Sequence, residues 1–298
     1  MLEADYFVVD VFTETALAGN PLAVVINPGG LSTERMQAIA REFNLSETTF
    51  VERRPVEVER TEGVRVRIFT TQEELNFAGH PTLGTASVLR LQAPEVMQGD
   101  TLTLALNVGP VPVRFPGQGL FGAMTQRDPE FGAELDPAEV ARLTGLTLED
   151  FCPEFPPQVV STGTAFAIVL LRSAQALARL RVNQQEATPW LRERGARWFY
   201  ALADVGATGD GDLRAFRARM QFHGGEDPAT GSAAGCAIAY LVLRGAVPAG
   251  EQVALRQGVE IGRSSEMILF AHIKQARVTD VRVGGSTVLV AKGHLFLP

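Results

Sequence analysis

Two stretches of the chain, residues 81–91 and 228–244, carry mainly apolar and small side chains. The second is the more extreme, because no charged residue occurs between Asp227 and Arg244. A helix that is apolar on all sides must be covered by protein on all sides. This stretch is also too short, and too rich in Gly and Ala, for the about 20 apolar residues of a membrane span. The pattern predicts two central helices, at 81–91 and 228–244, each running through a domain core.

Both predicted helices open on a polar residue followed by proline. Asp227 precedes Pro228, and His80 precedes Pro81, at an offset of 147 residues. A carboxylate can accept hydrogen bonds from the free N–H groups of a first helical turn, and proline fits the first helical position. We therefore expect His80 and Asp227 at the starts of the two central helices.

Two further similarities support an internal repeat. Residues 19–25 resemble residues 163–169, and the alternating stretch 64–69 resembles 216–222 just before the second central helix. Similarity that recurs in the same order at one large period indicates a duplicated domain.

The remaining pattern predicts strands with few amphipathic helices. Helices are expected at 32–43, from 136, at 173–181 and at 184–194, and residues 19–21 are expected to form a turn. Strands are expected at 6–12, 22–26, 64–70 (with strand structure leading into it from 47–51), 101–106, 110–115, 120–126, 166–171, 197–203, 213–222 and repeatedly from 252 to 298. The predicted fold class is α+β, with two pseudo-symmetric domains, each a curved, mostly antiparallel sheet rolled around one central apolar helix. The Pro/Gly-rich stretch 116–123 places the boundary between domains 1–118 and 119–298, and the last C-terminal strand could return to the first domain.

Composition narrows the class of protein. The 298 residues are 46% apolar and 20% charged, as in soluble globular proteins, and the net charge of −7 comes without a basic cluster. Nucleic acid and membranes are therefore not expected partners. The two cysteines form no disulfide framework, and the first residues lack the pattern of a secretion signal, so we expect a cytoplasmic protein.

Four polar positions are candidates for chemistry: Glu47, His80, Asp227 and Ser232. Two helix N-termini that face one cleft would offer N–H donors and partial positive charge to a carboxylate. Glu47 precedes an apolar strand, where shielding would raise its pKa and suit a general acid/base. The plain alternatives are a helix cap for Asp227 and a solvated surface acid for Glu47.

Other kinds of site have less support. The positions that a two-cysteine racemase would need hold Ala78 and Pro228, so a two-thiol mechanism is not expected. The four histidines show no metal-ligand spacing, and no metal is expected.

Three motifs together resemble those of the PhzF-like (phenazine biosynthesis) isomerases, which have the diaminopimelate-epimerase-like fold. They read Asn-Leu-Ser-Glu-Thr-Thr-Phe-Val around Glu47, Phe-Ala-Gly-His-Pro-Thr-Leu-Gly-Thr-Ala around His80, and Glu-Asp-Pro-Ala-Thr-Gly-Ser-Ala-Ala-Gly around Asp227. Residues 10–24 and 257–264 also fit, so the resemblance covers nearly the whole chain.

The resemblance implies a cofactor-free isomerase with its active site between the two domains. Glu47 would move a proton from one carbon to another, and His80 and Asp227 would assist. The substrate would be a small carboxylate held by Ser46, Gly79, Thr230, Gly231 and Ser232. Relatives often pair as homodimers, so a homodimer is expected here.

Two alternatives remain open at this level. An epimerase or racemase of an amino or hydroxy acid would pair Glu47 with Asp227 or His80 on opposite faces of one carbon. A non-catalytic protein of the same fold would bind carboxylates without exchanging a C–H proton.

Overall fold

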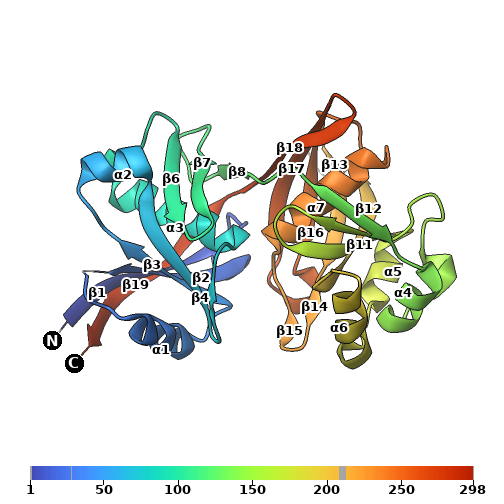
Figure 1. The fold of residues 1–298 in the computed structure, drawn as a ribbon, viewed down its shortest axis with the longest axis horizontal. Helices are drawn as coiled ribbons and strands as arrows, with labels where there is room; N and C mark the ends of the chain where they lie inside the picture. Colours follow the sequence, from blue (N-terminus) through green and yellow to red (C-terminus); the bar gives the residue numbers. More distant parts are fainter. Residues whose placement is uncertain (1, 28, 208–212, 298) are drawn as a thin grey trace. The chain divides into compact units, whose positions relative to one another are not determined.

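The computed structural model describes residues 2–27, 29–207 and 213–297. The chain divides into two compact units, the first comprising Met1–Met124 with Gly284–Pro298 and the second Thr125–Val283. The first unit thus extends six residues past the boundary expected at 118, and the C-terminal segment belongs to it. Each unit is described by itself below and can be followed in Figure 1.

Among its described residues, the first unit contains three α-helices, a short 3-10 helix and nine strands, except that the last residue of β8 belongs to the second unit. Its elements are β1 (Leu2–Val11), β2 (Asn20–Asn27), α1 (Thr33–Phe43), β3 (Glu47–Glu52), α2 (Val56–Glu62), β4 (Val64–Thr70), β5 (Glu74–Leu75), α3 (Gly79–Gln92), η1 (Pro94–Val96), β6 (Thr101–Leu106), β7 (Gly109–Arg114), β8 (Gly122–Thr125) and β19 (Thr287–Leu297).

The second unit contains the remaining elements. They are β9 (Glu130–Glu134), α4 (Pro137–Thr144), η2 (Leu148–Asp150), β10 (Gln158–Ser161), β11 (Ala165–Leu171), α5 (Ala174–Arg179), α6 (Gln184–Glu193), β12 (Trp198–Ala207), β13 (Arg214–Arg219), β14 (Gln221–Phe222), β15 (Gly225–Glu226), α7 (Gly231–Leu243), β16 (Gln252–Gln257), η3 (Val259–Ile261), β17 (Ser265–Lys274) and β18 (Arg277–Gly285).

The same strand order and the same directions recur in both units. In the first unit the neighbours run β19-β1-β2-β3-β4-β6-β7, and only the β2–β3 and β4–β6 pairs are parallel. In the second unit they run β9-β10-β11-β12-β13-β16-β17, and only the β11–β12 and β13–β16 pairs are parallel. Because each of the six successive pairings matches its counterpart in direction, the two units share one topology, as the internal repeat predicts.

A buried helix lies against the sheet in each unit. Helix α3 packs on β1, β2, β3, β6, β7 and β19, and α7 packs on β10, β11 and β17. Residues 79–89 of α3 are buried, as are Gly231 and residues 233–242 of α7. The sequence prediction of a central apolar helix in an α+β unit is therefore confirmed. The strands that pack on each helix are rich in apolar residues because their side chains contact the apolar surface of the helix.

The second central helix begins later than the pattern predicts. Asp227 and Pro228 precede α7, which starts at Gly231 with Thr230 at the N-cap position. The side-chain amide of Gln257 donates to the Asp227 carbonyl over 2.8 Å and accepts from the Thr230 N–H over 3.1 Å. These tertiary hydrogen bonds hold the segment as a turn, so the prediction of a helix from 228 is wrong.

Two other local predictions are also wrong. Residues 56–62 form helix α2, whereas the sequence pattern predicts strand structure from 47–51 through 64–70 and no helix between them. The helix is favoured because the Glu59 carboxylate, buried inside it, accepts hydrogen bonds from Arg53 Nε and the Arg54 N–H at 3.0 and 2.7 Å. Strand β2 begins at Asn20 and not at 22, which places Asn20 in the ladder opposite Val11.

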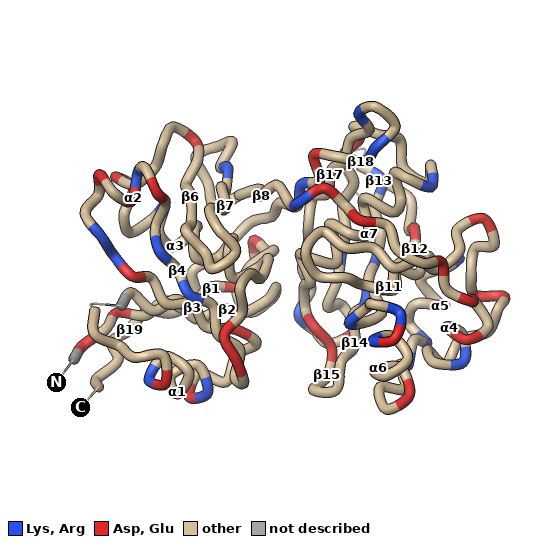
Figure 2. The backbone as a smooth tube through the Cα atoms, viewed as in Figure 1, with Lys and Arg blue, Asp and Glu red and all other residues tan. Residues whose placement is uncertain are grey.

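Charged residues of both signs are interspersed over the described parts of both units (Figure 2). This mixture agrees with the absence of a basic cluster in the sequence. Among the described helices, none is long and apolar enough to cross a membrane.

Candidate functional site

The starts of three elements meet in the first unit. Glu47 is the first residue of β3 and pairs in register with Leu22 of β2, the strand that opens at Asn20. His80 is the second residue of α3. We call Asn20, Glu47 and His80 the first-unit site.

The His80 ring bridges the other two residues of this site. Its Nε2 lies 3.3 Å from Glu47 Oε2, and its Nδ1 lies 3.3 Å from Asn20 Nδ2. The Nε2–Oε2 approach is close but is not aligned as a hydrogen bond. Catalytic pairs are often poorly aligned before substrate binds and tighten in the complex.

Burial determines the charge of His80. Only 6% of the residue is exposed, and burial lowers the pKa of the imidazole from 6.5 to about 3. The ring is therefore neutral at physiological pH. Because the amide nitrogen of Asn20 donates to Nδ1, the ring proton is on Nε2, the nitrogen nearest Glu47. His80 can thus act toward the Glu47 carboxylate as a neutral donor.

Helix α3 is fixed against β3 close to this site. The hydroxyls of Thr49 and Thr85 share a hydrogen bond of 2.8 Å between strand and helix, and both residues are buried. The first N–H groups of a helix have no acceptor within it. Gly79 and His80, the first two residues of α3, therefore carry N–H groups without an acceptor inside the helix, as an anion site requires.

A second cluster surrounds Asp227 in the second unit. The Thr230 hydroxyl donates to Asp227 Oδ2 over 2.6 Å, and Gln257 Nε2 donates both to the Asp227 carbonyl and to Thr230 Oγ1, at 2.8 and 2.9 Å. Asp227 is partly exposed, whereas Gln257 is fully buried. We call Asp227, Thr230 and Gln257 the second-unit site.

The segment that precedes Asp227 is also held in place. The Asp227 N–H donates to the carbonyl of Met220 over 3.0 Å. Its neighbour Glu226 forms two hydrogen bonds with the guanidinium of Arg219, at 2.8 and 2.6 Å, and both side chains are buried. Asp227 is therefore anchored from both sides along the chain.

The other predicted binding residues fall into the two units as follows. Ser46 is exposed and directly precedes Glu47, and Gly79 is the first, buried residue of α3. Gly231 is the first residue of α7, followed by the partly buried Ser232. The structure thus gathers Ser46, Gly79 and the first-unit site in one unit, and Gly231 and Ser232 with the second-unit site in the other.

Sequence reasoning missed Asn20, Gln257 and their roles. The motif around Asn20 was interpreted as a turn, although its recurrence in the repeat was a signal that it matters. Gln257 stands in a C-terminal stretch that resembles the family, but no local pattern shows that its amide reaches Asp227. Such a contact between β16 and a loop 30 residues away is visible only in the fold.

Cys236 is buried in α7, where burial raises its pKa to about 11, so it is a neutral thiol. Among the residues that the structure describes, no three His, Cys, Asp or Glu side chains are grouped to hold a metal ion.

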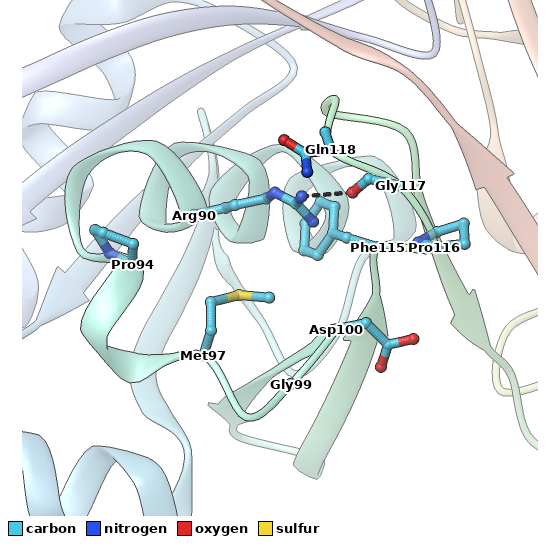
Figure 3. Close-up of a pocket in the computed structure, with 9 residues that line it drawn as sticks. All are labelled: Arg90, Pro94, Met97, Gly99, Asp100, Phe115, Pro116, Gly117 and Gln118. Atoms are coloured by element: carbon cyan, nitrogen blue, oxygen red, sulfur yellow. Dashed lines mark hydrogen bonds between the residues drawn. The ribbon is translucent and has the colours of Figure 1, made fainter.

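A surface pocket in the first unit lies away from the candidate site (Figure 3). Its volume is about 570 Å³, and its lining includes Arg90, Met97, Asp100 and Phe115. Arg90 stacks 4.6 Å from the centre of the Phe115 ring and donates to the Gly117 carbonyl. Ten residues of helix, about 15 Å, separate Arg90 from His80, so this pocket lies at the opposite end of α3.

Comparisons with known proteins agree over the whole chain. A sequence model of the family described as phenazine biosynthesis-like protein matches residues 9–293. The trans-2,3-dihydro-3-hydroxyanthranilate isomerase of Pseudomonas aeruginosa is 37% identical over 298 residues, which cover 98% of this chain and 99% of that protein.

Solved structures give the same result. The crystal structure of a phenazine biosynthesis protein of the PhzF family from Bacillus anthracis matches with a TM-score of 0.85 and 25% identity, covering 100% of both chains. A predicted epimerase from Pseudomonas aeruginosa matches with a TM-score of 0.80 and 36% identity, covering 99% of this chain and 100% of that one.

The fold and these matches define an isomerase with two units of one topology. The chain belongs to the phenazine biosynthesis-like (PhzF) family.

Proposed function

We propose that this isomerase moves a proton between two carbons of a small carboxylate-bearing substrate, with Glu47 as the general acid/base. The observation that carries the proposal is the close approach of a neutral, buried His80 to the Glu47 carboxylate. A general base must hold a lone pair toward the C–H bond that it breaks and then return the proton. A neutral donor on one side orients the carboxylate without the full charge that would suppress its basicity.

The proposal assigns complementary roles to the two units. The first-unit site supplies the proton carrier, and the Asp227 carboxylate of the second-unit site orients or assists the substrate. The N–H groups at the starts of α3 and α7, with Ser46 and Ser232, would hold the substrate carboxylate. The active site would then be a cleft to which both units contribute, as the family resemblance implies.

The first substrate to test is trans-2,3-dihydro-3-hydroxyanthranilate, because the Pseudomonas aeruginosa relative is named for it. Other small carboxylates extend the panel. Incubation in D₂O followed by mass spectrometry and NMR would show whether deuterium enters and at which carbon. Proton migration predicts deuterium at a new carbon together with a shifted double bond.

The decisive variant is Glu47→Gln, which keeps the side-chain shape and removes the base. We expect its turnover to fall by about 10² to 10⁴, or roughly 3–5 kcal/mol of transition-state stabilisation. Glu52→Gln is the matched control, because Glu52 ends the same strand and is partly exposed, 3.9 Å from Arg65. Near-normal exchange by Glu47→Gln would remove Glu47 from the mechanism.

A second candidate reaction is epimerisation, favoured by the similarity to the predicted epimerase of Pseudomonas aeruginosa. Here Glu47 and Asp227 or His80 would act on opposite faces of one carbon. Deuterium would then enter at the carbon that loses its proton, with inversion and without a moved double bond. The same D₂O experiment therefore separates the two reactions.

Ligand binding without any deuterium exchange would instead favour the non-catalytic carboxylate-binding protein. A homodimer and a cytoplasmic location stay predictions from the sequence.

A further inference from the structure

A buried tyrosine continues the hydrogen-bond network of the second-unit site. Tyr200, in β12, is fully buried, and its hydroxyl donates to Gln257 Oε1 over 2.8 Å. The same oxygen accepts the Thr230 N–H at 3.1 Å. Burial raises the pKa of Tyr200 well above 10, with a further increase from the nearby Asp227, so the hydroxyl keeps its proton and can donate.

The partners of Gln257 fix the orientation of its amide. The Thr230 N–H can only donate, so the atom that faces it is the amide oxygen. The Asp227 carbonyl can only accept, so the atom that faces it is the amide nitrogen. Because both assignments agree, the direction of every hydrogen bond in this network is determined.

The direction of the Thr230 hydroxyl follows from this orientation. Its oxygen accepts from Gln257 Nε2 at 2.9 Å, so its own proton is directed to Asp227 Oδ2 at 2.6 Å. The donor sequence therefore runs from Tyr200 through Gln257 and Thr230 to the Asp227 carboxylate. A carboxylate that accepts such a hydrogen bond is favoured in its ionised form.

The backbone is shaped to bring these groups together. Gly258 follows Gln257 with φ +76°, and a Cβ at this position would lie 2.7 Å from the Pro228 carbonyl oxygen and 2.4 Å from that of Arg263. Only glycine allows the loop after Asp227 to approach this closely. The Gln-Gly pair thus combines the amide that binds the loop with the space that the loop needs.

We propose that Tyr200 and Gln257 are positioning residues, which act through Thr230 to hold Asp227 as an oriented, ionised carboxylate. The proposal rests on the proposed function for the role of Asp227 in turnover. It adds that Thr230 serves Asp227 with its hydroxyl proton and does not donate that proton to the substrate. Asp227 then acts as a charged acceptor and not as a proton donor.

The first test is substrate-independent. Protein labelled with ¹³C at the Asp side-chain carboxyl carbon is titrated by NMR, with Asp227→Asn identifying the Asp227 signal. We expect Tyr200→Phe and Gln257→Met to raise the pKa of Asp227 by about half a unit to one unit, the effect of weakening one hydrogen bond. Tyr200→Phe carries the test if Gln257→Met does not fold.

The matched control is Tyr240→Phe. Tyr240 is a second buried tyrosine of the same unit, and its hydroxyl donates to the Pro156 carbonyl over 2.8 Å, away from Asp227. It loses a buried hydroxyl in the same way and is expected to leave the Asp227 titration unchanged. An unchanged titration in Tyr200→Phe, or an equal change in Tyr240→Phe, would overturn the positioning role.

Turnover provides the second test once a substrate is identified. Tyr200→Phe should lower kcat/KM about threefold to tenfold and move its acid limb to higher pH, whereas in an Asp227→Asn background it should have no further effect. Equal losses in both backgrounds would show that Tyr200 does not act through Asp227. If the NMR shift occurs but Glu47→Gln retains exchange, the proposed function fails while the positioning network stands.

Discussion

Acidification should destabilise the protein through His80. The pKa of this imidazole is lowered from 6.5 to about 3 in the folded protein, because the buried ring cannot be solvated as a cation. Below pH 6.5 the unfolded chain binds a proton at His80 that the folded protein does not bind. The contribution of the neutral His80 ring to the free energy of unfolding is therefore complete above pH 6.5 and is lost as the pH falls toward 3.

The size of the effect follows from the distance between the two pKa values. At pH 5 the unfolded-state imidazole is 1.5 pH units below its pKa of 6.5, and the folded-state imidazole is still neutral. At about 1.36 kcal/mol per unit, the loss is about 2 kcal/mol relative to pH 7.5. His80→Gln has no imidazole and should lack this contribution.

The assay is urea unfolding of wild type and His80→Gln at pH 7.5 and pH 5. The difference between their unfolding free energies should change by about 2 kcal/mol between the two pH values. His272→Gln, which removes an exposed histidine of β17, is the control and should not reproduce the change. In NMR spectra the His80 ring signals should not shift between pH 8 and 4, and a midpoint near 6.5 would refute the reasoning.

Two further predictions concern the packing of the second unit. In Gly235→Ala, the new Cβ would lie 1.9 Å from the side-chain oxygen of Gln126, whose amide nitrogen bonds to the start of α7, so urea unfolding should show a loss of about 1–3 kcal/mol. Glu226→Gln should cost about 3 kcal/mol, because it removes the carboxylate that forms two hydrogen bonds with the buried Arg219 guanidinium and leaves only the Glu260 carboxylate, 4.0 Å away. In the exposed pair with Arg256, Glu266→Gln should cost at most about 1 kcal/mol, and similar losses in the two glutamate variants would contradict the effect of burial.

The sequence predicts the fold well where burial alone decides the structure. Helices α3 and α7 are apolar all round, and the repeat gives them matching surroundings, so both could be found from pattern. Helix α2 could not, because a buried carboxylate, Glu59, stabilises a segment whose valines alternate as in a strand. The spacing of apolar residues indicates apolar contacts and contains no information on the ion pair between Arg53 and Glu59.

The candidate site shows the same division. Glu47 and His80 could be singled out as candidates from their motifs, and the structure places them in contact. Asp227 could be identified as a candidate from its motif, but its conformation could not be predicted. The hydrogen bond that its carbonyl accepts from Gln257 depends on strand β16, which is distant in the sequence. The tautomer of His80 likewise depends on Asn20, which is 60 residues away in the sequence.

The repeat has therefore produced two helix starts that differ in detail. His80 is inside the first turn of α3, where burial keeps it neutral, and Asp227 precedes α7 by four residues, where Thr230 and Gln257 direct a proton toward it. Asp227→Asn keeps an acceptor oxygen for the Thr230 hydroxyl and removes only the charge. A loss of turnover in that variant would measure the charge, whereas substitution of His80 changes packing and hydrogen bonding together. Equal sequence offset does not imply equal chemistry, and under the proposed function the two positions would serve one substrate in different ways.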